Sequence, residues 1–158
     1  MPRTSESSSK TLLLHWFVVG VMAALLVVSL VFCNTKGLAF QQPLPEHDRI
    51  LLRTILYVVA ILTLPLTNLI RHIQLRLNQT MPGDKSAKSR YLLTVLVSAI
   101  FSVSIGGYGL LMYLRGDGFN TLYIFTWVSA LGLYLYRPKA DEYQSIVSAL
   151  TERESEAD

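Results

Sequence analysis

The chain has little cysteine and little charge. Its 158 residues contain one cysteine, Cys33, so an intrachain disulfide cannot form. This also excludes oxidoreductases that work through a pair of thiols. Charged residues make up 16% of the chain, whereas a soluble domain has about a quarter. The composition therefore points away from an ordinary water-soluble domain.

The charged residues are missing from whole segments of the chain. No Asp, Glu, Lys or Arg occurs in residues 11–35, 54–70, 91–114 or 118–136. A transmembrane helix needs about 20 apolar residues, at a rise of about 1.5 Å each, to cross about 30 Å of hydrocarbon. One such segment is compatible with a buried helix of a soluble protein, but four in succession predict an all-α membrane protein. We expect an antiparallel bundle of four transmembrane helices over residues 12–136, with spans at about 12–33, 50–70, 91–114 and 119–136.

The N-terminal residues resemble the start of a secretory signal, because the polar segment 1–11 carries Arg3 and Lys10 before the first apolar segment. That apolar segment has about 22 residues, however, against 7–15 for the core of a signal peptide. We therefore expect an uncleaved first helix preceded by a disordered cytoplasmic tail.

The basic residues predict the orientation of the bundle. Lys and Arg near helix ends favour the cytoplasmic side of a membrane. Ten of the 14 basic residues lie on the side of the two termini, and four (Lys36, Arg49, Arg53 and Arg115) lie on the other. The loop after the second span supplies the strongest topology-determining group: Arg71, Arg76, Lys85, Lys88 and Arg90. Both termini are therefore expected in the cytoplasm, with the chain as a multi-pass protein of the inner membrane. Because the basic residues gather at helix ends, nucleic acid is not an expected partner.

Small residues recur at helical spacing in two of the expected spans. Gly20 and Ala24 are one turn apart in the first span, and Ser98, Ser102 and Gly106 recur every four residues in the third. Small side chains let helix backbones approach each other closely in lipid. These positions are predicted to be helix-packing sites, either between the first and third helices or along a seam between copies of the chain.

The second span carries two further signals. Pro65 removes one backbone hydrogen bond and is expected to kink the helix. Leu69, Ile73 and Leu77 keep the helical spacing beyond the apolar segment, so the helix is expected to continue into the cytoplasm as an amphipathic stem.

Residues 137–158 are expected to form a cytoplasmic tail. Tyr143, Ile146, Val147 and Leu150 fall on one face of a short helix, which predicts docking on a membrane surface, on a partner or on the chain's own stem. The acidic segment 151–158 that follows is expected to be disordered.

No motif for catalysis, nucleotide binding or metal binding is recognisable. The glycine-rich segment 106–109 lies within an apolar helix and lacks the Lys-Ser/Thr ending of a phosphate-binding loop. His15 and His72 are both expected near the cytoplasmic face, where they could serve as a pair of haem ligands, although histidine is ordinary at that depth. The prediction is a protein without cofactor, metal or catalytic residues.

The sequence therefore favours a small membrane protein that acts by protein contact, as an accessory or assembly subunit or an oligomeric scaffold. Its expected partners are the lipid bilayer and either another membrane protein or further copies of itself. Two alternatives stay open. One is a small transporter or channel formed by oligomerisation, with Asn68 and the serines of the third span along its path. The other is a membrane immunity protein, which the four-helix layout alone suggests.

Overall fold

The computed structural model describes residues 3–80 and 86–157, and these residues are all-helical, with no strand. Five α-helices and one short 3-10 helix follow one another along these described residues. Their bounds are α1 Arg3–Thr35, η1 Gly37–Phe40, α2 Glu46–Thr80, α3 Ala87–Leu114, α4 Phe119–Leu135 and α5 Ala140–Ala157. Three of them contain segments long and apolar enough to span a membrane: Leu12–Thr35, Glu46–Thr80 and Ala87–Leu114. The chain is accordingly a multi-pass membrane protein.

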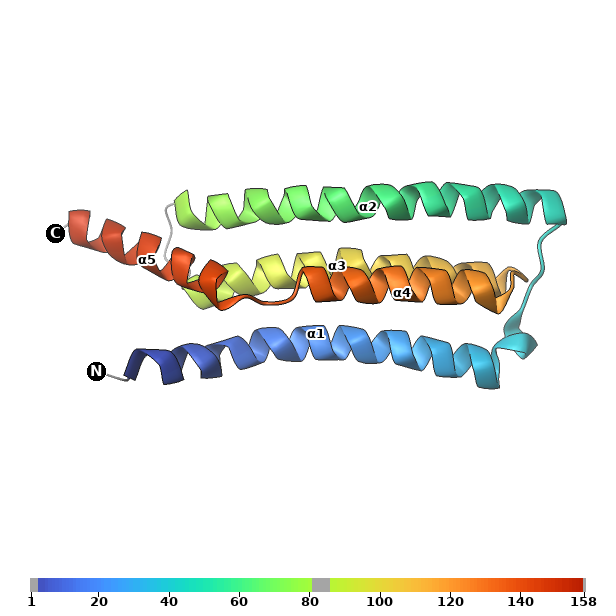
Figure 1. Ribbon diagram of the computed structural model, residues 1–158, viewed down its shortest axis with the longest axis horizontal. Coiled ribbons are helices and arrows are strands. Elements are labelled where there is room, and N and C mark those ends of the chain that lie inside the picture. The colour runs from blue at the N-terminus through green and yellow to red at the C-terminus, as the bar shows by residue number, and fades with distance from the viewer. Residues whose placement is uncertain (1–2, 81–85, 158) are drawn as a thin grey trace.

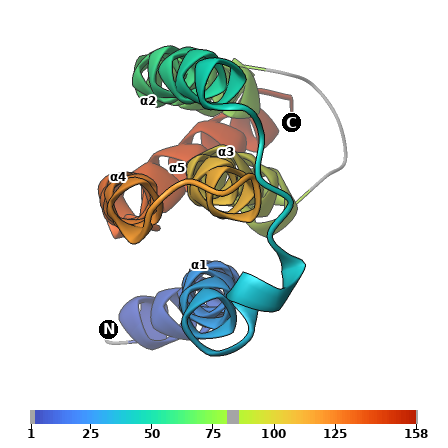
Figure 2. The ribbon, with the colours of Figure 1, turned by 90° about the vertical axis from the view of Figure 1, so that its right-hand side faces the viewer.

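The four long helices lie side by side, and successive helices run in opposite directions (Figure 1). Both termini lie at the same end of this bundle, which we call the terminal end; the opposite end is the distal end. Viewed along the bundle, α3 lies between α1 and α2, and α4 runs beside it (Figure 2). The third helix is therefore the one around which the others pack.

Two helices are longer than the sequence predicted. The tail 1–11 was expected to be disordered, yet α1 begins at Arg3, and α5 runs to Ala157 through the acidic segment expected to lack structure. Helix propagation adds one hydrogen bond per residue once a helix exists, so an anchored helix extends into polar sequence. The stem of the second helix is as predicted, because α2 continues to Thr80.

The distal end is closed by the segment that joins α1 to α2. Gln42 N–H donates to the Leu114 carbonyl at 2.7 Å, and Leu44 N–H donates to the Arg115 carbonyl at 3.1 Å. The α3–α4 turn is also held by α2, since Arg53 pairs with Asp117 at 3.2 Å. The two helix connections at this end therefore form one hydrogen-bonded unit.

The predicted stripe of small residues on α3 faces other helices. Ser98, Ser102 and Gly106 are all buried, and Ser129 of α4 donates from Oγ to the Ser102 carbonyl at 2.7 Å. A methyl group added at Gly106 would collide with Leu26 of α1 and lie 3.2 Å from the Ser129 hydroxyl. These small residues thus lie where α1 and α4 approach α3.

The other predicted pair lies elsewhere. Gly20 and Ala24 are exposed on α1, and a methyl group added at Gly20 would meet nothing within 4 Å. In contrast to the expectation of packing against the third helix, this pair leaves an open face within the described part of the chain.

Pro65 lies within α2, which stays helical through it from Glu46 to Thr80. Its side chain is exposed. One carbonyl beside it has a side-chain partner, because Tyr136 donates its hydroxyl to the Leu64 carbonyl at 2.7 Å. The predicted kink stays a prediction.

The backbones of α3 and α4 approach closely at Gly109, a glycine that the sequence did not mark as a packing site. A Cβ added at Gly109 would lie 2.8 Å from Cβ of Phe125 and 3.1 Å from the Leu122 carbonyl oxygen, which is backbone and cannot turn away. Gly109→Ala should therefore lower the free energy of unfolding by about 1–3 kcal/mol. SDS titration of the protein in mixed micelles, followed by circular dichroism, measures this loss.

Gly107 provides the control for this prediction. It lies two residues away on α3, and a Cβ there would meet nothing within 4 Å. Gly107→Ala should leave the stability unchanged or raise it by up to about 1 kcal/mol, because alanine favours helix. Equal losses in the two variants would contradict the close α3–α4 approach.

Candidate functional site: a buried arginine at the terminal end

Arg71 is a buried charged residue whose guanidinium makes four hydrogen bonds. It lies on α2 directly after the uncharged segment 54–70, and only 4% of its surface is exposed. Its Nη2 donates to Glu142 Oε2 at 2.6 Å and to the Arg137 carbonyl at 3.3 Å. Its Nη1 donates to the Tyr136 carbonyl at 2.9 Å and to the Ser98 hydroxyl at 3.3 Å. One guanidinium therefore joins α2, α3, the end of α4 and α5.

Tyr91 of α3 binds the same carboxylate oxygen as Arg71. Its hydroxyl lies 3.0 Å from Glu142 Oε2 and accepts the Lys139 N–H at 2.8 Å. The Lys139 ammonium also lies 3.9 Å from Glu142 Oε1, but the Lys139 side chain is half exposed, so this pair adds little. The carboxylate is therefore held chiefly by Arg71 and Tyr91.

Aromatic rings cover this polar group. His15 of α1 is fully buried, with its ring centroid 5.0 Å from that of Tyr91 and 6.2 Å from that of Tyr143 on α5. Ile146 of α5 is also fully buried and packs with Tyr91 and Val95. Helices α1, α3 and α5 meet at this aromatic cluster, which packs beside the ion pair and leaves 19% of the Glu142 side chain exposed.

The sequence of α5 explains why it docks here. Its buried residues follow the predicted spacing, with Ile146 facing the bundle and Tyr143 and Leu150 packed beside it. Glu142 lies in the first turn, where a carboxylate also opposes the helix dipole. The predicted amphipathic helix therefore covers α2 and α3 of its own chain.

The arrangement supports a structural rather than a catalytic role for Arg71. A buried guanidinium requires an opposite charge and filled hydrogen bonds, since desolvating an ion costs several kcal/mol. Here four acceptors surround it: a carboxylate, two backbone carbonyls and the Ser98 hydroxyl. We call this group the Arg71 latch, composed of Arg71, Tyr91 and Glu142.

The five predicted topology-determining residues have different environments. Arg71 is in the latch, and Arg90 is mostly buried, with its Nη1 donating to the Asn78 carbonyl at 3.1 Å. Arg76 and Lys88 are exposed, and Lys85 lies outside the described residues. Sequence reasoning thus missed the internal contacts of two of these residues, because a basic residue at the end of an apolar segment has the same pattern whether it faces water or the bundle.

The polar residues considered for a transport path lie in separate environments. Ser98 and Ser102 donate to the carbonyls four residues earlier on α3, each at 2.8 Å. Asn68 is exposed on α2 rather than turned towards these serines. The structure therefore does not bring these residues together along a path.

The two histidines considered as haem ligands are also apart. His15 lies in the aromatic cluster, whereas His72 is exposed on α2, and α1 and α2 lie on opposite sides of α3 (Figure 2). Among the residues that the structure describes, no three His, Cys, Asp or Glu side chains gather as metal ligands would.

No protein-family model, curated protein or solved structure matches the chain. The geometry of its own residues therefore carries the functional argument.

Removing the charge of the latch carboxylate should free α5. Glu142→Gln leaves the Arg71 cation buried without a counter-ion, a change that costs about 3 kcal/mol when the pair is largely buried. Hydrogen–deuterium exchange of the α5 amides should become about 100-fold faster. Asp141→Asn, the exposed neighbour, should leave exchange unchanged within about twofold. Similar protection of α5 in both variants would refute the latch.

Proposed function

We propose that the chain is an inner-membrane protein with four transmembrane helices and both termini in the cytoplasm. Support for the fourth span comes from α4, which has 17 residues and runs beside α3 within the bundle. It is about 26 Å long at 1.5 Å per residue, close to the thickness of the hydrocarbon core. Support for the orientation comes from the ten basic residues on the side of the termini.

We further propose that the protein acts by contact with another membrane protein, as an accessory or assembly subunit. The observation that carries this proposal is the open face of α1, where Gly20 and Ala24 are exposed and a Cβ added at Gly20 would meet no described residue within 4 Å. Small residues one turn apart allow close approach of a helix from another protein in lipid.

A groove beside this face extends the contact surface. It lies between α1 and α4, with a volume of about 450 Å³, and its walls are almost wholly apolar. Trp127, on the α4 wall, is 76% exposed. The lining residues are Ala23, Leu26, Val27, Leu30, Tyr123, Thr126, Trp127, Ala130 and Leu133. A helix lying along α1 would place side chains into this groove.

A transporter or channel has less support from the geometry. The serines of α3 bond to backbone carbonyls, and Ser129 of α4 closes onto the Ser102 carbonyl. The Ser98 and Ser102 hydroxyls thus donate within α3, and the Ser129 hydroxyl joins α4 to α3, so each already has an internal acceptor. The immunity-protein alternative gains no support from a particular contact.

A bulky residue at Gly20 should abolish the partner contact without unfolding the bundle. Gly20→Leu places a side chain in open space of this chain but in the path of a partner helix. Recovery of the partner after crosslinking in membranes and purification in a mild detergent should fall about tenfold, as expected for overpacking of a close contact.

Gly107→Leu is the matched control, because Gly107 also faces open space, on α3. The Gly107→Leu variant should recover the partner as well as the wild-type protein does. Unchanged recovery with Gly20→Leu, or a lone monomer recovered from wild-type membranes, would refute the contact proposal. A complex made only of this chain would assign the surface to self-association instead of an accessory role.

The orientation has its own test, using introduced cysteines. Cys33 is buried and should react little with a membrane-impermeant maleimide. In intact cells, Leu38→Cys at the distal end should be labelled, whereas Ser89→Cys should be labelled only after the membrane is opened. Both positions are exposed. The reverse pattern would invert the proposed topology.

A further inference from the structure

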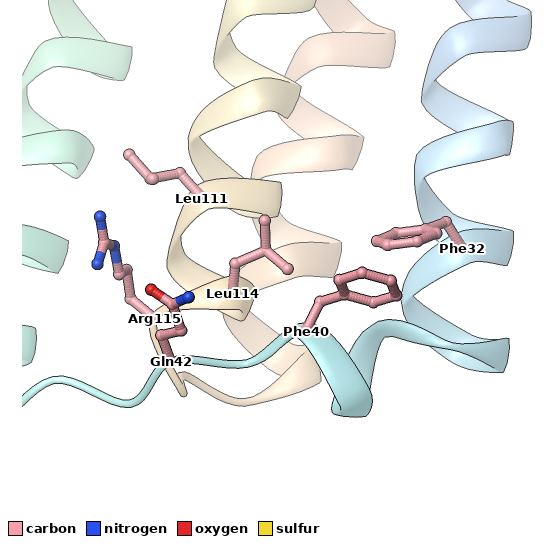
Figure 3. Close-up of a pocket in the computed structure, with 6 residues that line it drawn as sticks. All are labelled: Phe32, Phe40, Gln42, Leu111, Leu114 and Arg115. Carbon is pink, nitrogen blue, oxygen red and sulfur yellow. The ribbon is translucent and has the colours of Figure 1, made fainter.

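A second cavity lies at the distal end of the bundle, opposite the end that holds the Arg71 latch. It has a volume of about 300 Å³ and lies where α1, η1, the connector to α2 and the end of α3 meet (Figure 3). Its lining residues are Phe32, Phe40, Gln42, Leu111, Leu114 and Arg115.

The two sides of this cavity differ in chemistry. Phe32 and Phe40 form an aromatic wall, with ring centroids 5.5 Å apart. Figure 3 shows these rings on one side of Leu114, and the side chains of Arg115 and Gln42 close together on the other. The cavity therefore combines an apolar wall with a cationic and amide-bearing edge.

The Arg115 guanidinium is available at this edge. Within the described part of the chain, no side-chain hydrogen bond or ion pair engages Arg115, while its backbone N–H caps α3. Neighbouring charged groups already have partners: Arg49 donates to the Gly116 carbonyl at 3.1 Å, and Asp117 pairs with Arg53. An anion arriving at Arg115 would therefore not have to displace an internal partner.

The depth of Arg115 in the membrane indicates the anion. It directly follows the candidate span Ala87–Leu114, so it lies at the level of the lipid headgroups. Leu111 and Gly107 continue the same face of α3 towards the membrane centre; Leu111 is exposed, and Gly107 leaves open space beside the helix. A molecule with an anionic group at headgroup depth and an apolar chain running inward fits this geometry.

We propose that this cavity binds one anionic phospholipid. The phosphate accepts hydrogen bonds from Arg115 and from the side-chain amide of Gln42, and the first part of an acyl chain lies against Phe32, Phe40 and Leu111. The site is distinct from the proposed contact face on α1 and depends only on membrane insertion of the chain.

Native mass spectrometry of the full-length protein tests this site. Wild-type protein titrated with phosphatidylglycerol should retain one lipid per chain, and should retain phosphatidylcholine more weakly. Arg115→Gln should lower the retention of phosphatidylglycerol about tenfold, as loss of a charge-assisted hydrogen bond predicts. Lys36→Gln removes an exposed cation from the same end outside the cavity and should change retention by less than about twofold.

Two further experiments test the apolar wall of the cavity and distinguish the proposed lipid from a soluble anion. Leu111→Trp keeps the cation but fills the cavity, and it should also lower the retention of phosphatidylglycerol; it serves as well if Arg115→Gln fails to fold. Glycerol phosphate should not displace the lipid. Equal losses with Arg115→Gln and Lys36→Gln, no effect of Leu111→Trp, displacement by glycerol phosphate, or no preference for phosphatidylglycerol would each overturn the proposal.

Discussion

The architecture depends on one electrostatic constraint, the burial of the Arg71 guanidinium. A cation at the edge of the apolar layer must receive a counter-charge and hydrogen-bond acceptors, or remain in water. The chain supplies these from three directions, through Glu142 of α5, the backbone at the end of α4 and the hydroxyl of Ser98. The positions of α5 and of the α4–α5 connection follow from this requirement.

The two ends of the bundle are held together by different means. At the terminal end, a separate helix closes over an ion pair and an aromatic cluster. At the distal end, two connections bond to each other through their backbones, with the Arg53–Asp117 pair beside them. The distal connections leave a cavity with a cationic edge, whereas the terminal closure uses its buried cation internally. The distal end therefore offers a guanidinium to an anion, whereas Arg71 at the terminal end already has its counter-ion.

Much of the fold could be predicted from local patterns. Uncharged segments identified the long helices, the spacing of Ile146 and its neighbours predicted α5, and the small residues of α3 marked its contacts. The latch could not be predicted, because Arg71 and Glu142 are 71 residues apart in sequence and only packing brings them together. The environments of Gly20 and Gly109 could not be predicted from the sequence either. Both are glycines in apolar helices, yet one faces open space and the other meets a backbone carbonyl.

The sequence separation of Arg71 and Glu142 also determines when the ion pair can form during synthesis. Translation proceeds at about 5–20 residues per second, so Glu142, 71 positions further along the chain, is made roughly 4–14 seconds after Arg71. Throughout that interval α2 carries a cation whose final counter-ion does not yet exist. The newly made helix must therefore keep this arginine in water or among headgroups, and the bundle reaches its final form only after α5 has been synthesised.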